Sequence, residues 1–243
     1  MFKILRDHPD ISGFHNTGVS EDEGQLLQTV YPAARKYGGP GKFGFNPDSF
    51  LDESSALVSP ANALALFDQW SRHWDISKPL LLEKSPPNLV RSRFLQALFP
   101  NSHFIMQLRH PVAVALATQK WSRTPLPALI EHWIVCHERF ADDRRYLNRL
   151  LTLTYEELVA TPDACVERIH GFLQVPHTPR GQQVETTVNR KYFERWRETL
   201  KNQSGAKVKE FLQRMEPRVN RFGYSLLELD RLTPLDADFS RPG

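Results

Sequence analysis

The sequence predicts an α/β protein in which short parallel strands alternate with longer helices. Three short apolar runs predict the strands, at 80–82, 103–108 and 150–155. A helical pattern of apolar residues follows each run, and this alternation is typical of a doubly wound parallel sheet with helices on both faces. Such short runs also occur inside buried helices, but their length and their flanking prolines and charges favour strands.

The other elements follow from local signals along the chain. Residues 1–6 are expected to be the last part of a helix that stops at His8-Pro9-Asp10, and the glycines of 37–42 predict a loop. Residues 60–73 are expected to be helical, with Leu64, Phe67 and Trp70 at helical spacing. Further helices are expected over 88–99, 112–121, 127–147 and 163–173.

Length and composition exclude several classes of protein. The 243 residues, 40% of them hydrophobic, predict one globular domain over 1–243 rather than a disordered chain. The sequence contains no apolar run near eighteen residues, so we expect no membrane span, and the N-terminus carries charges too early for a secretory signal. Two cysteines, Cys136 and Cys165, exclude a disulfide framework and indicate a reducing, cytoplasmic location, and we expect both to be buried and inert.

Charge is distributed unevenly along the chain. The net charge is only +3, yet residues 180–221 contain eleven Lys or Arg and five Glu. This basic segment indicates either an anionic ligand or a solvated helix face. A nucleic-acid partner is not expected, because the aromatic residues do not alternate with the basic ones.

Three side chains capable of binding a nucleotide follow the three predicted strands. Lys84 follows the first run, Arg109 the second and Tyr155 the third. Because ligands bind beyond the carboxyl ends of parallel strands, these side chains are expected at one edge, with charge for phosphate and a ring for a base. Pro111 suits the first turn of the next helix, whose free N–H groups would face the same anion.

At this point the chain resembles the sulfotransferases, and most closely their bacterial and tyrosylprotein-type branch. The resemblance runs over about 1–224 and leaves 225–243 as a tail. It rests on ordered blocks at 82–88 (LEKSPPN), 98–102 (LFPNS), 104–111 (FIMQLRHP), 154–159 (TYEELV), 172–173 (FL) and 222–224 (FGY). Any one block is a weak signal, whereas the ordered set is specific.

The resemblance implies a P-loop-type α/β fold and the donor 3′-phosphoadenosine 5′-phosphosulfate (PAPS), with no metal. A sulfuryl group would pass to a hydroxyl or amine of a small-molecule, carbohydrate or lipid acceptor. Lys84 matches the lysine that neutralises charge near the bridging oxygen, Arg109 the arginine that binds the 3′-phosphate, and Tyr155 the tyrosine beside the adenine. The family's helix serine is Ala117 here, and the neighbouring Thr118 is its candidate substitute.

Other parts of the family pattern match loosely or depart from it. Arg190 and Lys191 match the late basic segment that closes the donor site. His15 or Asn16 falls where the tyrosylprotein-type branch has a glutamate as general base; of the two only a histidine can act as a base, and the carboxylates of 21–23 are alternatives. A histidine in a loop without a role is an equally open reading.

The family's first strand and its 5′-phosphosulfate loop precede the position that matches Met1 in this sequence. We therefore expect the sheet to lack an N-terminal strand, because an internal methionine has been read as the start. We also expect the chain alone to fold poorly or to have little sulfuryl-transfer activity. The alternative is a nucleotide-binding or partner-binding protein that has lost catalysis.

Three further classes are not supported by the residues. A Walker loop at Gly41-Lys42 would need glycine at position 36 and serine or threonine at 43, where Lys36 and Phe43 stand, which argues against a P-loop kinase. His132 and His137 are five residues apart, which does not align two metal ligands on a helix face. A G-x-S-x-G elbow of a serine hydrolase does not occur in the sequence.

Overall fold

The computed structural model describes residues 1–179, 181, 185, 187–202 and 205–233. The last ten residues of the predicted tail, 234–243, lie outside the described residues. The strands in the described part are β1 (Ile11–Gly13), β2 (Leu80–Leu82), β3 (Phe104–Leu108) and β4 (Leu150–Thr154).

All strand pairing in the described residues is parallel. β1 pairs with β2, so that Ile11 lies opposite Leu80, and β3 pairs with β4, so that Phe104 lies opposite Leu150. The two pairs are separate sheets, since β2 and β3 do not pair with each other. The prediction of an α/β fold with parallel strands is therefore confirmed, with the strands in two pairs.

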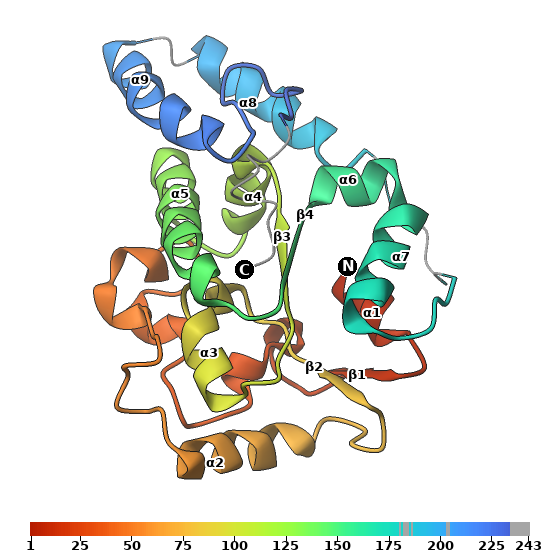
Figure 1. Ribbon diagram of the computed structural model, residues 1–243. Helices are drawn as coiled ribbons and strands as arrows, with labels where there is room; N and C mark the ends of the chain where they lie inside the picture. The colour runs from red at the N-terminus through yellow and green to blue at the C-terminus, as the bar shows by residue number, and fades with distance from the viewer. Residues whose placement is uncertain (180, 182–184, 186, 203–204, 234–243) are drawn as a thin grey trace.

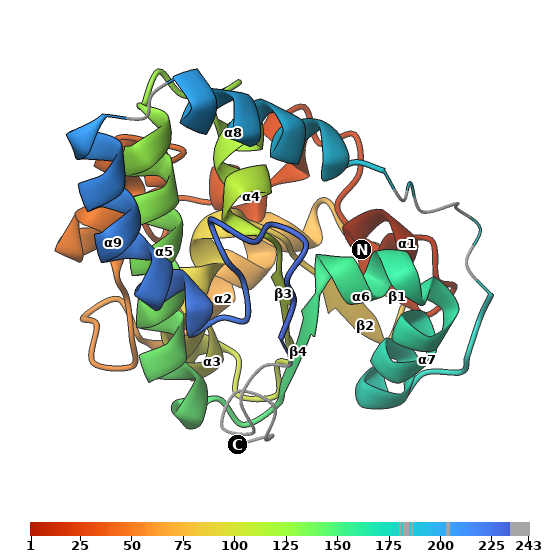
Figure 2. The ribbon, with the colours of Figure 1, turned by 90° about the horizontal axis from the view of Figure 1, so that it is seen from above.

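Helices lie on both sides of the β3–β4 pair, with α4 and α5 on one side and α1, α6 and α7 on the other (Figure 1). Seen from above, α8 crosses over α4, and α9 lies beside α5 (Figure 2). The α-helices of the described chain are α1 (Phe2–Arg6), α2 (Pro60–Ser71), α3 (Ser92–Leu98), α4 (Pro111–Thr118), α5 (Leu126–Asp143), α6 (Tyr155–Ala160), α7 (Pro162–Leu173), α8 (Arg190–Asn202) and α9 (Ala206–Asn220).

Two apolar clusters connect these layers. The larger one is built from β3, α4, α5, α8 and α9, and its buried members include Leu108, Ile130 and Trp196. A smaller one joins α1, β1, β4 and α7 through Leu5, Ile11, Leu153 and Ile169. Because this second cluster contains residues of both strand pairs, α1 and α7 hold the two sheets together through hydrophobic contacts rather than through backbone hydrogen bonds.

Two helix starts set the positions of the predicted strand-end residues. The His110 ring caps α4, since its Nδ1 accepts from the Val112 backbone N–H at 3.2 Å, and Pro111 is the first helical residue. Thr154 and Glu157 form a reciprocal capping box, which ends β4 and starts α6. Tyr155, the last residue of the predicted run 150–155, is thus the first residue of a helix and lies one position beyond the end of β4.

The structure differs from the sequence-based expectation on the face of α2. Leu64 and Phe67 are exposed, while Leu66 and Trp70 are buried. The buried positions are four residues apart and match the helical period equally well, so spacing alone did not identify the correct face. The strand β1 and the short helix α6 were not predicted, because three and six residues are too short for a periodic signal.

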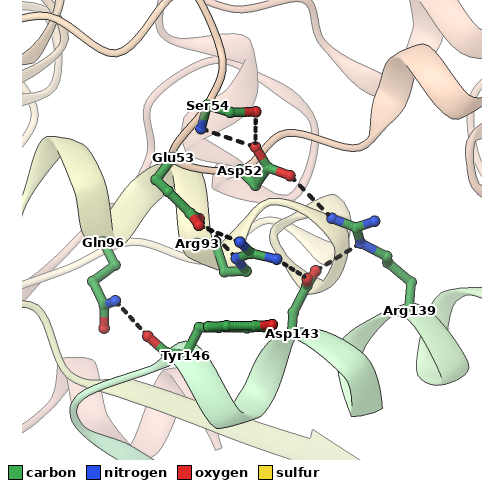
Figure 3. Close-up of polar contacts among 8 residues, drawn as sticks. All are labelled: Asp52, Glu53, Ser54, Arg93, Gln96, Arg139, Asp143 and Tyr146. Carbon is green, nitrogen blue, oxygen red and sulfur yellow. Dashed lines mark hydrogen bonds and ion pairs between the residues drawn. The ribbon is translucent and has the colours of Figure 1, made fainter.

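The long segment between β1 and α2 contains no α-helix or strand and covers the α3–α5 side of the molecule. Figure 3 shows how an ionic network fixes this segment: the buried Asp143 carboxylate accepts from Arg93 Nη1 at 3.2 Å and from Arg139 Nε at 2.8 Å. Arg93 also pairs with Glu53, and Arg139 with Asp52 at 3.5 Å. Arg93 of α3 and Arg139 of α5, both held by Asp143, therefore tie the covering segment to these two helices.

Candidate functional site

Lys84 and Tyr155 line one cavity of about 410 Å³. Other parts of its wall come from Phe2 and Arg6 of α1 and from Glu21 in the loop after β1. Lys84 is the second residue after β2, and Tyr155 is the first residue after β4. The two parallel pairs therefore present their carboxyl ends to the same cavity. This is the edge at which the sequence predicts a ligand.

The Lys84 ammonium is directed by the loop opposite β2. Its Nζ donates to the Glu21 backbone carbonyl at 3.0 Å and lies 3.9 Å from Glu23 Oε1. It also lies 5.7 Å from the centre of the Phe2 ring. About one third of the side chain is exposed (34%), so the ammonium is oriented by these contacts and still reaches solvent in the cavity.

Glu83 anchors that loop from the protein interior. Its carboxylate accepts from the Gly24 backbone N–H at 3.1 Å, from the Ser85 hydroxyl at 2.5 Å and from the Asn88 amide. Burial raises the pKa of Glu83. Residue 24 has to be glycine for this close approach, because a Cβ there would lie 2.5 Å from the Glu83 side chain.

Arg109 lies directly on Tyr155. Its guanidinium carbon is 4.3 Å from the centre of the Tyr155 ring and 5.7 Å from that of Tyr192. Its Nε and Nη2 donate to Asn189 Oδ1 at 3.0 and 2.8 Å. The structure therefore brings Lys84, Tyr155 and Arg109 together along one rim, with Tyr155 between the two cations.

The side chain of Glu156, a residue of α6, reaches the start of α4, where the sequence analysis expects free N–H groups. Its Oε1 accepts from the His110 backbone N–H at 3.2 Å and from Asn189 Nδ2 at 2.8 Å, and its Oε2 accepts from the Tyr224 hydroxyl at 2.8 Å. The expectation of free N–H groups is thus wrong here, because Glu156 takes the His110 N–H and the His110 ring takes the next one.

Three of the predicted donor-binding residues do not join this rim. Thr118 ends α4, seven residues after Pro111, so it lies roughly 10 Å along the axis from the Arg109 end. Its methyl group faces the loop at Gly41. Arg190 pairs with Glu194 at 3.1 Å and is 79% exposed, while Lys191 is exposed with its ammonium 5.4 Å from the Tyr192 ring centre. The residues near Arg109 are instead Asn189 and Tyr192, which the sequence analysis did not select as site residues.

His15 lies in a different cavity from Lys84. It is exposed and lines a space of about 320 Å³ together with Ser12, Asp75 and Lys78. The carboxylates considered as alternatives are nearer: Glu21 and Asp22 line the Lys84 cavity, and Glu23 pairs with Lys84 itself. The structure therefore does not bring the predicted base and Lys84 together.

Asp22 and Glu23 differ in their basicity. Hydrogen bonds from the Thr17 backbone N–H and hydroxyl lower the pKa of Asp22, which makes it a weaker base. Burial raises the pKa of Glu23 despite its pairing with Lys84, and its side chain is only 16% exposed. Glu23 is thus the better proton acceptor of these two.

The basic C-terminal segment forms several ion pairs within the protein. Arg197 pairs with Asp230 at 3.0 Å, and Arg218 with Glu138 at 2.6 Å. Its apolar residues are buried, including Trp196, whose indole N–H donates to the Leu226 carbonyl at 2.8 Å. Of the two readings left open by the charge distribution, these contacts favour a solvated helix face for α8 and α9.

The remaining chemistry-bearing residues show no site of their own. Cys136 and Cys165 are both free and buried, as expected, and burial raises the pKa of the Cys136 thiol. Within the described ranges, groups of three or more His, Cys, Asp or Glu arranged around a common metal position do not occur. A helix with the length and hydropathy to cross a bilayer is absent from the same ranges.

The fold and the rim define an α/β protein with two cations and an aromatic ring beyond the carboxyl ends of its parallel strands. Residues 1–179 match the model of the sulfotransferase family. Because this match covers well over half of the 243 residues, the chain belongs to the sulfotransferase family.

Among solved structures, a sulfotransferase domain from the curacin biosynthetic pathway is 24% identical, with a TM-score of 0.40. That match covers 52% of this chain and 55% of that chain, so the two align over about half of their lengths. The curated proteins include no significant match to the sequence.

Proposed function

We propose that this chain is a PAPS-dependent sulfotransferase that moves a sulfuryl group from the donor to a hydroxyl or amine of a small-molecule, carbohydrate or lipid acceptor in the cytoplasm. Family membership supports transferase chemistry. The observation that carries the choice of donor is the rim of Lys84, Tyr155 and Arg109: Lys84 and Tyr155 line one cavity, and the Arg109 guanidinium packs on the Tyr155 ring.

Each member of the rim has a part in this proposal. Arg109 offers a planar fork of N–H donors, the geometry that suits a phosphate, and Tyr155 offers a ring for the adenine. Lys84 supplies a point charge in the cavity that Tyr155 also lines. Placing both cations around one anionic donor lowers the free energy of a transition state in which charge moves onto the leaving phosphate.

The reaction balances without a further reactant. The acceptor oxygen or nitrogen attacks the sulfur, and the bond from sulfur to the bridging oxygen of the 5′-phosphate breaks. The products are a sulfate ester or sulfamate and adenosine 3′,5′-bisphosphate. The acceptor proton passes to a base, for which Glu21 on the cavity wall and Glu23 beside Lys84 are better situated than His15.

Turnover of ³⁵S-labelled PAPS over a panel of phenol, sugar, lipid and amine acceptors tests this function. Release of adenosine 3′,5′-bisphosphate together with label on an acceptor supports it. Lys84→Ala should abolish that turnover with an unchanged circular dichroism spectrum, and Lys78→Ala, which removes a lysine from the other cavity, serves as the matched control. Equal turnover by wild type and Lys84→Ala would exclude Lys84 from the reaction.

The alternative is a family member that binds nucleotide without catalysis. It is favoured by Ala117 at the family's serine position and by Thr118 pointing toward Gly41, since the α4 hydroxyl does not assist Arg109. Donor binding without label transfer to any acceptor of the panel would select this second function.

A further inference from the structure

Glu156 sits at the centre of contacts that converge on Arg109, although it does not touch Arg109 itself. Its two carboxylate oxygens accept from three groups that come from three different parts of the chain: the start of α4, the start of α8 and the segment after α9. The proposed function uses Arg109 and leaves Glu156 without a role.

The contact between Glu156 and Asn189 determines how the Asn189 amide is turned. Glu156 Oε1 accepts from Asn189 Nδ2 at 2.8 Å. The Asn189 carbonyl oxygen therefore points the opposite way, and it accepts from both Nε and Nη2 of Arg109. A carboxylate accepts only, so Glu156 excludes the flipped amide, which would turn the two N–H groups of Asn189 toward the guanidinium.

Arg109 keeps free donors while it is held in this way. A guanidinium has five N–H groups, and the Asn189 oxygen takes one from Nε and one from Nη2. The Tyr155 ring packs 4.3 Å from the guanidinium carbon and fixes the plane of the group. Hydrogen bonds to other described residues do not use the N–H groups at the outer end of the fork, so these groups can meet an anion.

We propose that Glu156 is a positioning residue that holds Arg109 in its phosphate-binding orientation through Asn189. The inference rests on the proposed function, because it assigns Arg109 to the 3′-phosphate of the donor. Asn189 and Tyr224 both lie beyond residue 179, where the family match ends, so the C-terminal part of this chain contributes to the arginine site through Glu156.

The test compares the affinities of adenosine 3′,5′-bisphosphate and of AMP, which lacks the 3′-phosphate, by calorimetry. The dissociation constant of AMP divided by that of adenosine 3′,5′-bisphosphate isolates the contribution of the 3′-phosphate contact. We expect Glu156→Ala to reduce this ratio at least fivefold and to change the affinity for AMP little. Glu156→Gln, which retains an acceptor oxygen for Asn189, should restore part of the ratio.

Glu157→Gln is the matched control. Glu157 stands in the same helical turn and caps α6 through Thr154, and the contacts described for it do not include Asn189 or Arg109. Loss of its charge should lower the melting temperature and leave the ratio unchanged. Asn189→Ala removes the link between Glu156 and Arg109 and keeps the other Glu156 contacts. It should reduce the ratio as Glu156→Ala does. This variant provides the test if Glu156→Ala does not fold.

An unchanged ratio in folded Glu156→Ala or in Asn189→Ala would overturn the positioning role. Failure of the proposed function would look different, because wild type would then not prefer the bisphosphate. In that case the Arg109 Nε–H signal in ¹H–¹⁵N spectra decides the inference. Its exchange with water should be slow in wild type and accelerated by Glu156→Ala, and equal exchange rates would overturn the inference.

Discussion

The Arg109 guanidinium lies on the face of the Tyr155 ring, with its central carbon 4.3 Å from the ring centre. The two residues follow different strands and are brought together because β3 and β4 are parallel and end at the same edge. A cation on an aromatic face is stabilised by the electrons of the ring and also loses side-chain freedom. The two side chains therefore form a preorganised pair rather than two independent surface residues, and this order suits the proposed phosphate contact.

Arg109→Ala is predicted to weaken the binding of adenosine 3′,5′-bisphosphate by at least about tenfold, since hydrogen bonds to charged groups contribute about 1.5–3 kcal/mol. Arg109→Lys should fall between wild type and alanine, because lysine keeps the charge and loses the planar fork. Calorimetric titration measures both. An unaltered affinity in Arg109→Ala would remove Arg109 from the phosphate site.

The proton acceptor is the second prediction. Glu23→Gln or Glu21→Gln should lower kcat strongly and flatten the acidic limb of its pH profile, because one of these carboxylates takes the acceptor proton. His15→Gln should leave the profile unchanged, since His15 lines another cavity. A kcat profile altered by His15→Gln alone would restore the histidine as the base.

The buried carboxylate of the ionic network gives the third prediction. Asp143→Ala should destabilise the protein by about 1.5–3 kcal/mol, because it removes charged hydrogen bonds from Arg93 and Arg139, which keep only their partners Glu53 and Asp52. Asp68→Ala is the control, since its pair with Arg72 is exposed on both sides and contributes no more than about 1 kcal/mol. Urea denaturation compares the two, and equal losses would contradict this role of Asp143.

Acid sensitivity is the fourth prediction. Burial lowers the pKa of His110 to about 4 from an ordinary 6.5, and it similarly lowers the pKa of His132 to about 4 and that of His137 to about 3. Between pH 6.5 and 4 the unfolded chain binds protons that the folded chain does not. Stability is therefore full above pH 6.5 and falls with acidification, by about 1.4 kcal/mol per pH unit for each histidine.

His110→Asn isolates one of these groups. Asparagine keeps an acceptor for the Val112 N–H and does not titrate, so the slope of the unfolding free energy against pH should decrease by about 1.4 kcal/mol per pH unit. Denaturation curves recorded between pH 4 and 7 give both slopes. Identical slopes in wild type and variant would show that His110 is charged in the folded protein.

Much of the fold could be predicted because its signals are local. The run at 150–155 ends where Thr154 and Glu157 cap the next helix, and His110-Pro111 starts another. The strand β1 could not be predicted, because its Ile11-Ser12-Gly13 acquires its structure only by pairing with Leu80–Leu82. The buried face of α2 also depends on tertiary packing, which buries Leu66 and leaves Leu64 exposed.

The candidate site divides in the same way. Lys84, Arg109 and Tyr155 could be selected because each directly follows a predicted strand, and the topology brings strand ends together. Asn189 and Tyr224 could not be selected, since Asn189 reaches Arg109, and Tyr224 reaches Glu156, only across long separations in sequence. The neighbouring Glu157 carries the recognisable capping signal, which conceals the different role of Glu156.

The most direct test of the central claim is the position of adenosine 3′,5′-bisphosphate in a crystal structure of its complex with this chain. The account predicts the adenine at Tyr155, the 3′-phosphate within hydrogen-bond distance of the outer nitrogens of Arg109, and the 5′-phosphate directed toward Lys84. A nucleotide bound elsewhere on the protein, with the Lys84 cavity left open, would contradict it.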